Sequence, residues 1–308
     1  MPFRFIVRPQ GILSTPRLLK QALGAQRTLR WPGPSHRKPS YLKDFFLTYP
    51  PIEELEEYAQ NQSVQSSRST NGRRELLSAG HSNIYQSRMD SYSTARAFAS
   101  ASKPSQRLLL HQHGFPVPRT SFSSTNPSVS ASQSPGVNSN WFGVDRSGRD
   151  LGDQPKYIVR PFRHSGGQGY RLTNNPSDYE EGREYIQEVY PKNHEYRIIV
   201  VRGKPLLTLY KRRPETLTYE QPWNHANGSS FVTVDNPDNN RLRHTDVYER
   251  INNASGLLNN LDLVGIDVMY ARRGEYVITE FNLCPAITLE HNLQKVAEHV
   301  NSDSFLSR

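Results

Sequence analysis

Cysteine and long apolar runs are both scarce in this sequence of 308 residues. Its one cysteine, Cys284, excludes an intrachain disulfide and is typical of a protein in a reducing cytosol. No stretch approaches the roughly 18 apolar residues that cross a bilayer, and the mean hydropathy is −0.73. The start, MPFRFIVRPQG, has arginines in its short apolar run and lacks the h-region of a signal peptide. We therefore expect a cytoplasmic protein whose first strand is Phe3–Val7.

Several familiar motifs are missing as well. The glycines show neither P-loop nor Rossmann spacing, and no zinc-finger or RNP-type pattern occurs. Residues 1–120 carry 17 lysines and arginines against 7 acidic residues, whereas residues 121–308 carry 21 against 22. A basic surface favours phosphates, nucleic acid or an acidic polypeptide, although an ordinary solvated surface explains it equally well. Without a supporting motif, nucleic-acid binding stays a minor hypothesis.

The first hundred residues have the pattern of a small α/β domain. The strand at Phe3–Val7 is followed by Ser14-Thr15-Pro16, which is a good helix start, and by a second strand at Thr28–Trp31. This order of strand, helix and strand is typical of α/β folds. Ile52–Ala59 is predicted to be helical. Residues 60–93 are polar with little periodicity, which indicates an irregular tail.

Residues 101–303 show a different pattern, with short strands joined by turns. A helix is predicted at Pro104–His113, and the serine- and asparagine-rich residues 120–150 predict a long loop. Arg202-Gly203-Lys204 and similar turns favour antiparallel hairpins. The expected strands are KYIVRPF, YRLT, YIQEVY, EYRIIVV, KPLLTLY, SSFVTV, VGIDVMY and EYVITEF, and two more helices are expected at Val247–Leu258 and Leu289–Val300. The segment is therefore predicted to be α+β.

Two acidic residues and an asparagine lie in the last two of these strands. A turn at Arg272–Gly274 returns the chain from Asp267 to Glu280 and Asn282, which are two residues apart and project from one face. If the strands pair as a hairpin, Asp267 lies near both. Carboxylate and amide oxygens suit Mg²⁺. An exposed strand face is the alternative, but these strands are otherwise apolar, and burial of an unpaired charge is costly.

A glycine-rich segment, HSGGQG, follows the strand that ends at Arg160. Gly166, Gly167 and Gly169 allow backbone N–H groups to approach phosphate oxygens, and Arg160 supplies a cation beside them. An ordinary flexible hairpin is the alternative explanation of three glycines.

A third segment, YIQEVYPKNHEYRIIVV, has Glu188 and Glu195 seven residues apart on either side of a turn. A strand of this kind can offer backbone groups to the edge of a nucleobase and a carboxylate to ribose hydroxyls. Taken alone, it is only another hairpin.

These three segments, in this order, resemble the ATP-grasp superfamily of carboxylate–amine ligases. The resemblance covers about residues 100–300 and is strongest in GIDVMYARRGEYVITEFNLCPAI, which is similar to the metal-binding hairpin of D-alanine–D-alanine ligases and of ligases that add glutamate to a ribosomal protein. It implies an α+β fold in which two subdomains grip ATP, preceded by a small α/β domain. The implied metal ligands are Asp267, Glu280 and Asn282, the implied adenine hinge is Gln187, Glu188, Val189 and Tyr190, and the implied ribose-binding acid is Glu195.

The resemblance also implies the groups that bind phosphates. SKPSQRLLLHQHGFPVPRT resembles the family's lysine–helix–Gly-φ-Pro segment, which makes Lys103 a phosphate-binding lysine. Lys211 matches a further phosphate cation, and Gly166, Gly167 and Gly169 match a flexible lid. Arg160 stands where the family usually has a second lysine. Because a guanidinium is a planar fork and an ammonium a point charge, the nucleotide geometry is expected to differ there.

Two further positions bear on the chemistry. Gly265 occupies the place of a catalytic arginine in the D-alanine ligases, so the same substrate chemistry is not expected. Arg197, with Lys211, is predicted to be catalytic by binding the carboxylate or a phosphate; a structural ion pair with Glu195 or another acid is an equal alternative. Cys284, beside the metal strand, is interpreted as a small buried residue and not as a nucleophile.

The resemblance implies a ligase that uses ATP with Mg²⁺ or Mn²⁺, forms an acylphosphate and releases ADP and phosphate. Its acceptor is expected to be an amino acid, a peptide or a protein tail, and the basic residues in 1–120 favour an acidic one. The pattern is most similar to uncharacterised bacteriophage proteins, which would place it in a host cytoplasm. The alternatives are an inactive nucleotide-binding or virion-associated structural protein of the same fold, and an ATP-dependent kinase or nucleic-acid-binding module.

Overall fold

The computed structural model describes just over half of the chain. Described are residues 4–7, 27–30, 44–46, 102–122, 141–144, 156–162, 169–218, 221, 223–224, 227–258, 261–271, 274–283, 285, 287 and 289–301. For the first three of these ranges only the backbone is described. The predicted helix at 52–59, the irregular tail at 60–93, two of the three loop glycines (Gly166 and Gly167) and Cys284 lie outside the described residues.

The larger sheet contains the two strands in which the sequence places the metal ligands. Its order is β11-β10-β9-β12-β13, and neighbouring strands are antiparallel. The strands are β9 (His194–Val201), β10 (Lys204–Arg212), β11 (Ser230–Thr233), β12 (Val264–Tyr270) and β13 (Tyr276–Asn282). Arg202 and Gly203 adopt positive φ between β9 and β10, and Gly274 does so between β12 and β13. These turns confirm the two hairpins that were predicted from sequence.

A second antiparallel sheet has the order β5-β4-β8-β6-β7. Its strands are β4 (Thr120–Ser121), β5 (Trp141–Phe142), β6 (Tyr157–Pro161), β7 (Arg171–Thr173) and β8 (Glu184–Glu188). The predicted loop over residues 120–150 is corrected at residues 120–121 and 141–142, where β4 and β5 extend this sheet. Two-residue strands have no alternation to detect; β4 is defined by its pairing with β8, and β5 by its pairing with β4.

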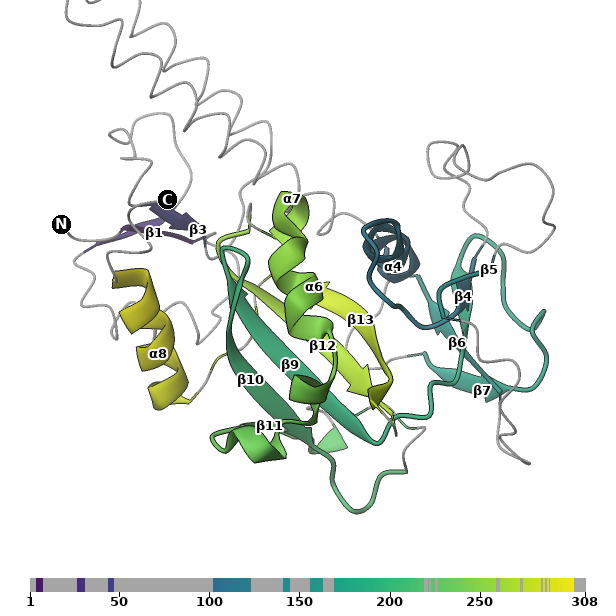
Figure 1. Cartoon of the computed structure of the whole chain (residues 1–308). Helices are drawn as coiled ribbons and strands as arrows, with labels where there is room; N and C mark the ends of the chain where they lie inside the picture. The colour runs from purple at the N-terminus through teal and green to yellow at the C-terminus, as the bar shows by residue number, and fades with distance from the viewer. Residues whose placement is uncertain are drawn as a thin grey trace, which may run out of the picture.

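The two faces of the larger sheet are covered by different helices (Figure 1). One core joins the sheet to α6 (Val247–Asn253) and α7 (Ser255–Leu258), and a separate core joins the opposite face to α8 (Glu290–Asn301). The single helix predicted at Val247–Leu258 is interrupted at Ala254. The weak helix formers around this point explain the interruption. Short 3₁₀ turns at η3 (Pro237–Asn239) and η4 (Arg241–His244) precede α6.

Helix α4 (Lys103–Gln112) lies between the two sheets (Figure 1). Ser102 caps its first turn and Pro104 stands at the first helical positions, an arrangement that is common at helix starts. The backbone N–H of Lys103 donates to Phe162 at the end of β6, whereas the buried Arg107 donates from Nε to the carbonyl of Thr279 on β13. The helix therefore fixes the two sheets relative to each other.

In the amino-terminal region, β1 (Arg4–Val7), β2 (Arg27–Arg30) and β3 (Asp44–Phe46) form a parallel sheet of order β2-β1-β3. Parallel pairing requires crossover connections and is typical of α/β units. The boundary predicted at residue 100 stays a prediction. Within the described part of the chain, no helix has the length and apolar character needed to span a membrane.

Candidate nucleotide and metal site

Three predicted site residues form one row across the larger sheet. Asp267 on β12 lies directly opposite Glu280 on β13 and directly opposite Arg197 on β9. Residues in register on neighbouring strands share a face of the sheet, with Cβ atoms roughly 5 Å apart. Asn282 shares that face with Glu280, two residues further along β13. The pairing that the sequence analysis required of this hairpin is confirmed.

Arg197 and Asp267 form a two-pronged ion pair. Arg197 donates from Nε to Oδ1 at 2.6 Å and from Nη2 to Oδ2 at 2.8 Å. Burial by itself would raise the pKa of Asp267, but Arg197, aided by Lys211 and Lys103, holds that pKa below its usual value. Of the two roles left open for Arg197, the ion pair is present, and its partner is Asp267 and not Glu195. The carboxylate is therefore ionised and keeps lone pairs for a further ligand.

Gly265 makes room for this ion pair. A Cβ atom at this position would lie 2.8 Å from Cβ of Pro285 and 3.1 Å from Cδ of Arg197. Both separations are well below the roughly 3.5–4.0 Å of ordinary carbon contacts. Glycine is thus required at position 265 by the close approach of Pro285 and Arg197.

Glu280 has a cation of its own. The Nζ atom of Lys103, at the first position of α4, donates to Oε2 of Glu280, and both side chains are about one quarter exposed. Lys103 reaches the row formed by Arg197, Asp267 and Glu280 because α4 packs against β13. The phosphate-binding lysine and the metal-binding acid of the sequence analysis are therefore direct neighbours.

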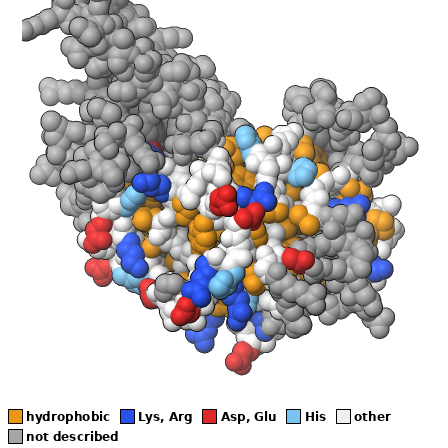
Figure 2. All heavy atoms as spheres, in the orientation of Figure 1, with side chains coloured by type: hydrophobic (Ala, Val, Ile, Leu, Met, Phe, Trp, Pro, Cys, Tyr) orange, Lys and Arg blue, Asp and Glu red, His pale blue; other side chains and the backbone are white. Residues whose placement is uncertain are grey.

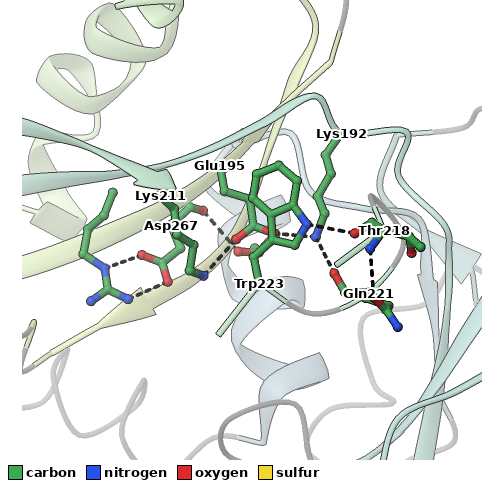
Figure 3. A network of polar contacts seen from close by, with 9 residues as sticks. Lys192, Glu195, Lys211, Thr218, Gln221, Trp223 and Asp267 are labelled. Atoms are coloured by element: carbon green, nitrogen blue, oxygen red, sulfur yellow. Dashed lines mark hydrogen bonds and ion pairs between the residues drawn. The ribbon is translucent and has the colours of Figure 1, made fainter. Parts of the chain in front are cut away.

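Glu195 lies between two lysines (Figure 3). Lys192 donates to its Oε1 at 2.5 Å and Lys211 to its Oε2 at 2.8 Å. Burial would raise the pKa of Glu195, yet the two ammonium groups hold it below its usual value. Burial lowers the pKa of Lys192, and Glu195 opposes that shift. The sequence analysis named Glu195 and Lys211 but missed Lys192, which stands in an irregular turn without any pattern.

Arg160 brings a cation from the second sheet. It lies at the end of β6, close enough to Arg107 and Lys192 to lower the pKa of each by like-charge repulsion. Its Nε is buried and has no hydrogen-bond partner within the described part of the chain. Gly169 adopts positive φ at +65°, and a Cβ there would lie 2.8 Å from Cγ of Pro161. The buried Nε of Arg160, without a partner among the described residues and near the turn at Gly169, fits an anionic ligand.

The predicted adenine hinge lies at the end of β8. Gln187 is buried, and its side-chain oxygen accepts from Nη1 of Arg107 at 2.5 Å. The backbone N–H groups of Glu188 and Val189 donate to carbonyls of neighbouring segments. These two N–H groups are therefore already paired, and the role of the hinge toward adenine stays a prediction.

The charges around the site leave an excess of cations. The basic residues are Lys103, Arg160, Lys192, Arg197 and Lys211, and the acidic residues are Glu195, Asp267 and Glu280. Over the visible face of the described chain, by contrast, acidic and basic side chains are interspersed (Figure 2). No described group of three histidine, cysteine or acidic residues suits a metal, so a hard-oxygen site would need Asn282 as its third ligand. The donors present fit Mg²⁺, and the cation excess fits phosphates.

No protein-family model matches the chain, and no curated protein matches it. Several solved structures, however, are similar to it. A Chryseobacterium gregarium RiPP-associated ATP-grasp ligase in complex with ADP and a leader and core peptide is 12% identical, with 97% of this chain and 96% of that chain covered and a TM-score of 0.50. The ATP-grasp ligase PsnB complexed with minimal precursor is 15% identical over 97% and 98%, at a TM-score of 0.49. The macrocyclase MdnC from Microcystis aeruginosa MRC bound with precursor peptide MdnA is 13% identical over 98% and 100%, at 0.46.

At 12% identity, the first of these likenesses establishes the fold alone. The chain has the ATP-grasp fold, with the α+β composition that the sequence predicts.

Proposed function

We propose that this chain is an ATP-dependent ligase that joins a carboxylate to an amine through an acylphosphate and releases ADP and phosphate. The observation that carries the proposal is the row of Arg197, Asp267 and Glu280 across three strands, with Lys103 brought onto it from α4. Oxygen ligands for a divalent cation and cations for phosphates meet there, on a fold whose similar structures include ligases in complex with ADP.

The nucleotide would lie between the two sheets. Lys103, Arg160 and Lys211 are the cations for its phosphates, and the glycine segment ending at Gly169 would cover them. The Gln187–Tyr190 hinge would hold adenine, and Glu195 would accept from the ribose hydroxyls. Among the described residues the buried Nε of Arg160 has no hydrogen-bond partner, which supports the phosphate assignment because a buried guanidinium nitrogen without a partner is costly.

Mg²⁺ would be held by Asp267, Glu280 and Asn282, and when bound it would neutralise charge on the phosphate oxygens. The residues already prepare this site, because Asp267 and Glu280 each form an ion pair with a cation of the chain. With a metal-bound polyphosphate in the site, Lys103 would be free to move from Glu280 to a phosphate, and the Glu280 carboxylate would be free to hold the metal.

The reaction needs no nucleophilic side chain. A carboxylate oxygen of the substrate forms a bond to the γ-phosphorus while the bond from that phosphorus to the β-phosphate oxygen breaks, which releases ADP. The amine nitrogen then bonds to the acyl carbon, the acyl–phosphate bond breaks, phosphate leaves, and the nitrogen loses its proton. Lys211 would stabilise the transferred group. Arg197 would keep Asp267 oriented and contribute positive charge.

The test is incubation of the protein with Mg-ATP and pools of amino acids, acidic peptides and protein tails, followed by mass spectrometry. We expect ADP, phosphate and a new amide. Formation of AMP would refute the acylphosphate route. Tight binding of Mg-ATP without turnover over all acceptors would favour the inactive nucleotide-binding or virion-associated alternative.

Variants test the metal assignment. Asp267→Asn and Glu280→Gln should each abolish ADP formation, because both remove an anionic ligand of the cation. Asp238→Asn and Glu298→Gln are matched controls on exposed positions and should leave turnover unchanged. Full turnover in either site variant would show that the metal ligands are assigned wrongly.

A further inference from the structure

Two lysines share one carboxylate in the site, but they are not equivalent. The Lys192 side chain is 5% exposed and that of Lys211 is 17% exposed. Besides Glu195, Lys192 donates to the backbone carbonyl of Gln221 at 3.2 Å and lies 4.8 Å from the centre of the Trp223 ring. Lys211 lies farther from its aromatic neighbour, at 5.5 Å from the centre of the Phe231 ring. Lys192 is therefore the more firmly held of the two.

Two of the groups around Lys192, Gln221 and Trp223, come from the connection between β10 and β11. Trp223 is 2% exposed, and its indole N–H donates to the carbonyl of Thr218. Figure 3 shows the Trp223 ring beside the Lys192 ammonium, with Lys211 approaching Glu195 from the side where Asp267 lies. A buried ammonium with a carboxylate, a carbonyl and an aromatic face has every kind of partner that stabilises a lysine cation.

We propose that Lys192 is a positioning residue, the permanent counter-ion of Glu195, and that its presence frees Lys211 to leave Glu195 for the terminal phosphate of ATP. The inference rests on the proposed nucleotide site, and it deepens that proposal by distinguishing a fixed lysine from an exchanging one.

The physical reason is the burial of Glu195. If Lys192 were absent, the departure of Lys211 would leave a buried carboxylate without a counter-ion, which costs several kcal/mol. Lys211 would then stay on Glu195, and two contacts would be lost together: the cation at the terminal phosphate, and the Oε2 acceptor for ribose. With Lys192 in place, Oε1 stays neutralised while Oε2 becomes available.

The test measures two affinity ratios. The first is the dissociation constant of Mg-ADP divided by that of the non-hydrolysable Mg-AMPPNP, and it reports the contribution of the terminal phosphate. The second is the dissociation constant of the 2′,3′-dideoxy analogue of Mg-ATP divided by that of Mg-ATP, and it reports the contribution of the ribose hydroxyls. Lys192→Met should lower both ratios about tenfold or more, since each charged hydrogen bond contributes roughly 1.5–3 kcal/mol. Lys211→Met should lower only the first. Lys192→Arg should restore both, and Lys295→Met on α8 should change neither.

A merely structural role for Lys192 predicts a different result. Lys192→Met would then weaken the binding of all four nucleotides by one common factor and leave both ratios as in the wild type, which would overturn the inference. Failure of the wild type to bind any Mg-nucleotide would refute the proposed function as well. A crystal structure of the wild type with Mg-AMPPNP decides the matter even if Lys192→Met does not fold. We expect Lys192 on Glu195 and Lys211 on the phosphates; Lys211 still on Glu195 would refute the exchange.

Discussion

Substitution of Gly265 by alanine is expected to disable the site without removing any charged group. The added Cβ would lie 2.8 Å from Cβ of Pro285 and 3.1 Å from Cδ of Arg197. Ordinary carbon contacts begin at about 3.5 Å, so both neighbours have to move by several tenths of an ångström. Gly265 lies on the inner strand β12, opposite both Ile199 and Asn282. Because β12 is held from both sides, Pro285 and the Arg197 side chain are the groups that have to shift.

The magnitude follows from two contributions. Overpacking of a buried position costs about 1–3 kcal/mol. Displacement of Arg197 weakens two charge-assisted bonds to Asp267, each of which contributes about 1.5–3 kcal/mol when intact. Because part of each is recovered by relaxation, we expect a loss of about 2–4 kcal/mol in the free energy of unfolding. Turnover should fall about 100-fold, which is the effect of a displacement of about 1 Å in an active site.

Gly274→Ala is the matched control. Gly274 has φ of +81°, and a Cβ there would meet only the carbonyl oxygen of His244, at 3.9 Å. Its cost is backbone strain of about 1–2 kcal/mol, far from any clash with the site. Urea unfolding gives the stability of both variants, and ADP formation is measured at a temperature where both are folded. A Gly265→Ala protein that turns over within about twofold of the wild type would refute the reasoning.

Two other variants test the contacts that hold the site. Arg107→Met should lower the free energy of unfolding by about 2–4 kcal/mol, because it leaves the side-chain oxygen of Gln187 and the carbonyl of Thr279 without their donor. Urea unfolding measures this free energy, and the exposed Arg183→Met is the control. A decrease in Arg107→Met no larger than that in Arg183→Met would contradict the assignment. Arg197→Met should cost most at neutral pH. The depressed pKa of Asp267 stabilises the wild type above the unfolded-state pKa of about 3.9, and this is lost as pH falls through the folded-state pKa. The stability difference between the two proteins, measured by urea unfolding from pH 7 to pH 3, should therefore shrink on acidification; a constant difference would refute the ion-pair assignment.

Much of the site could be read from local sequence. The spacing of Glu280 and Asn282 fixes their common face, because side chains alternate along any strand. Apolar residues on either side of Asp267 indicate a strand that is mostly buried, and Gly274 marks the turn between them. Pro104 after a serine marks the start of α4. Each of these inferences depends on residues within a few positions of one another, and each is confirmed.

Lys192 and Arg107 were missed for the opposite reason. Lys192 stands in an irregular turn before β9, and its partner Trp223 lies in the connection that follows β10. Arg107 is one of several polar residues on a short helix, and its partners belong to two different sheets. Nothing local distinguishes these cations from solvated surface residues, because burial is decided by what packs against them.

The sequence by itself determined the eight strands from β6 to β13 and the strand faces on which Asp267, Glu280 and Asn282 lie. Backbone geometry sets those faces residue by residue. The tertiary structure decided which charges meet: Arg197 with Asp267 across β9 and β12, Lys103 with Glu280 through the packing of α4, and Glu195 with two lysines. These pairs join residues as far as 177 positions apart. Charge interactions between such distant residues depend on distance and burial in the folded chain, and neither is written in the spacing of residues along it.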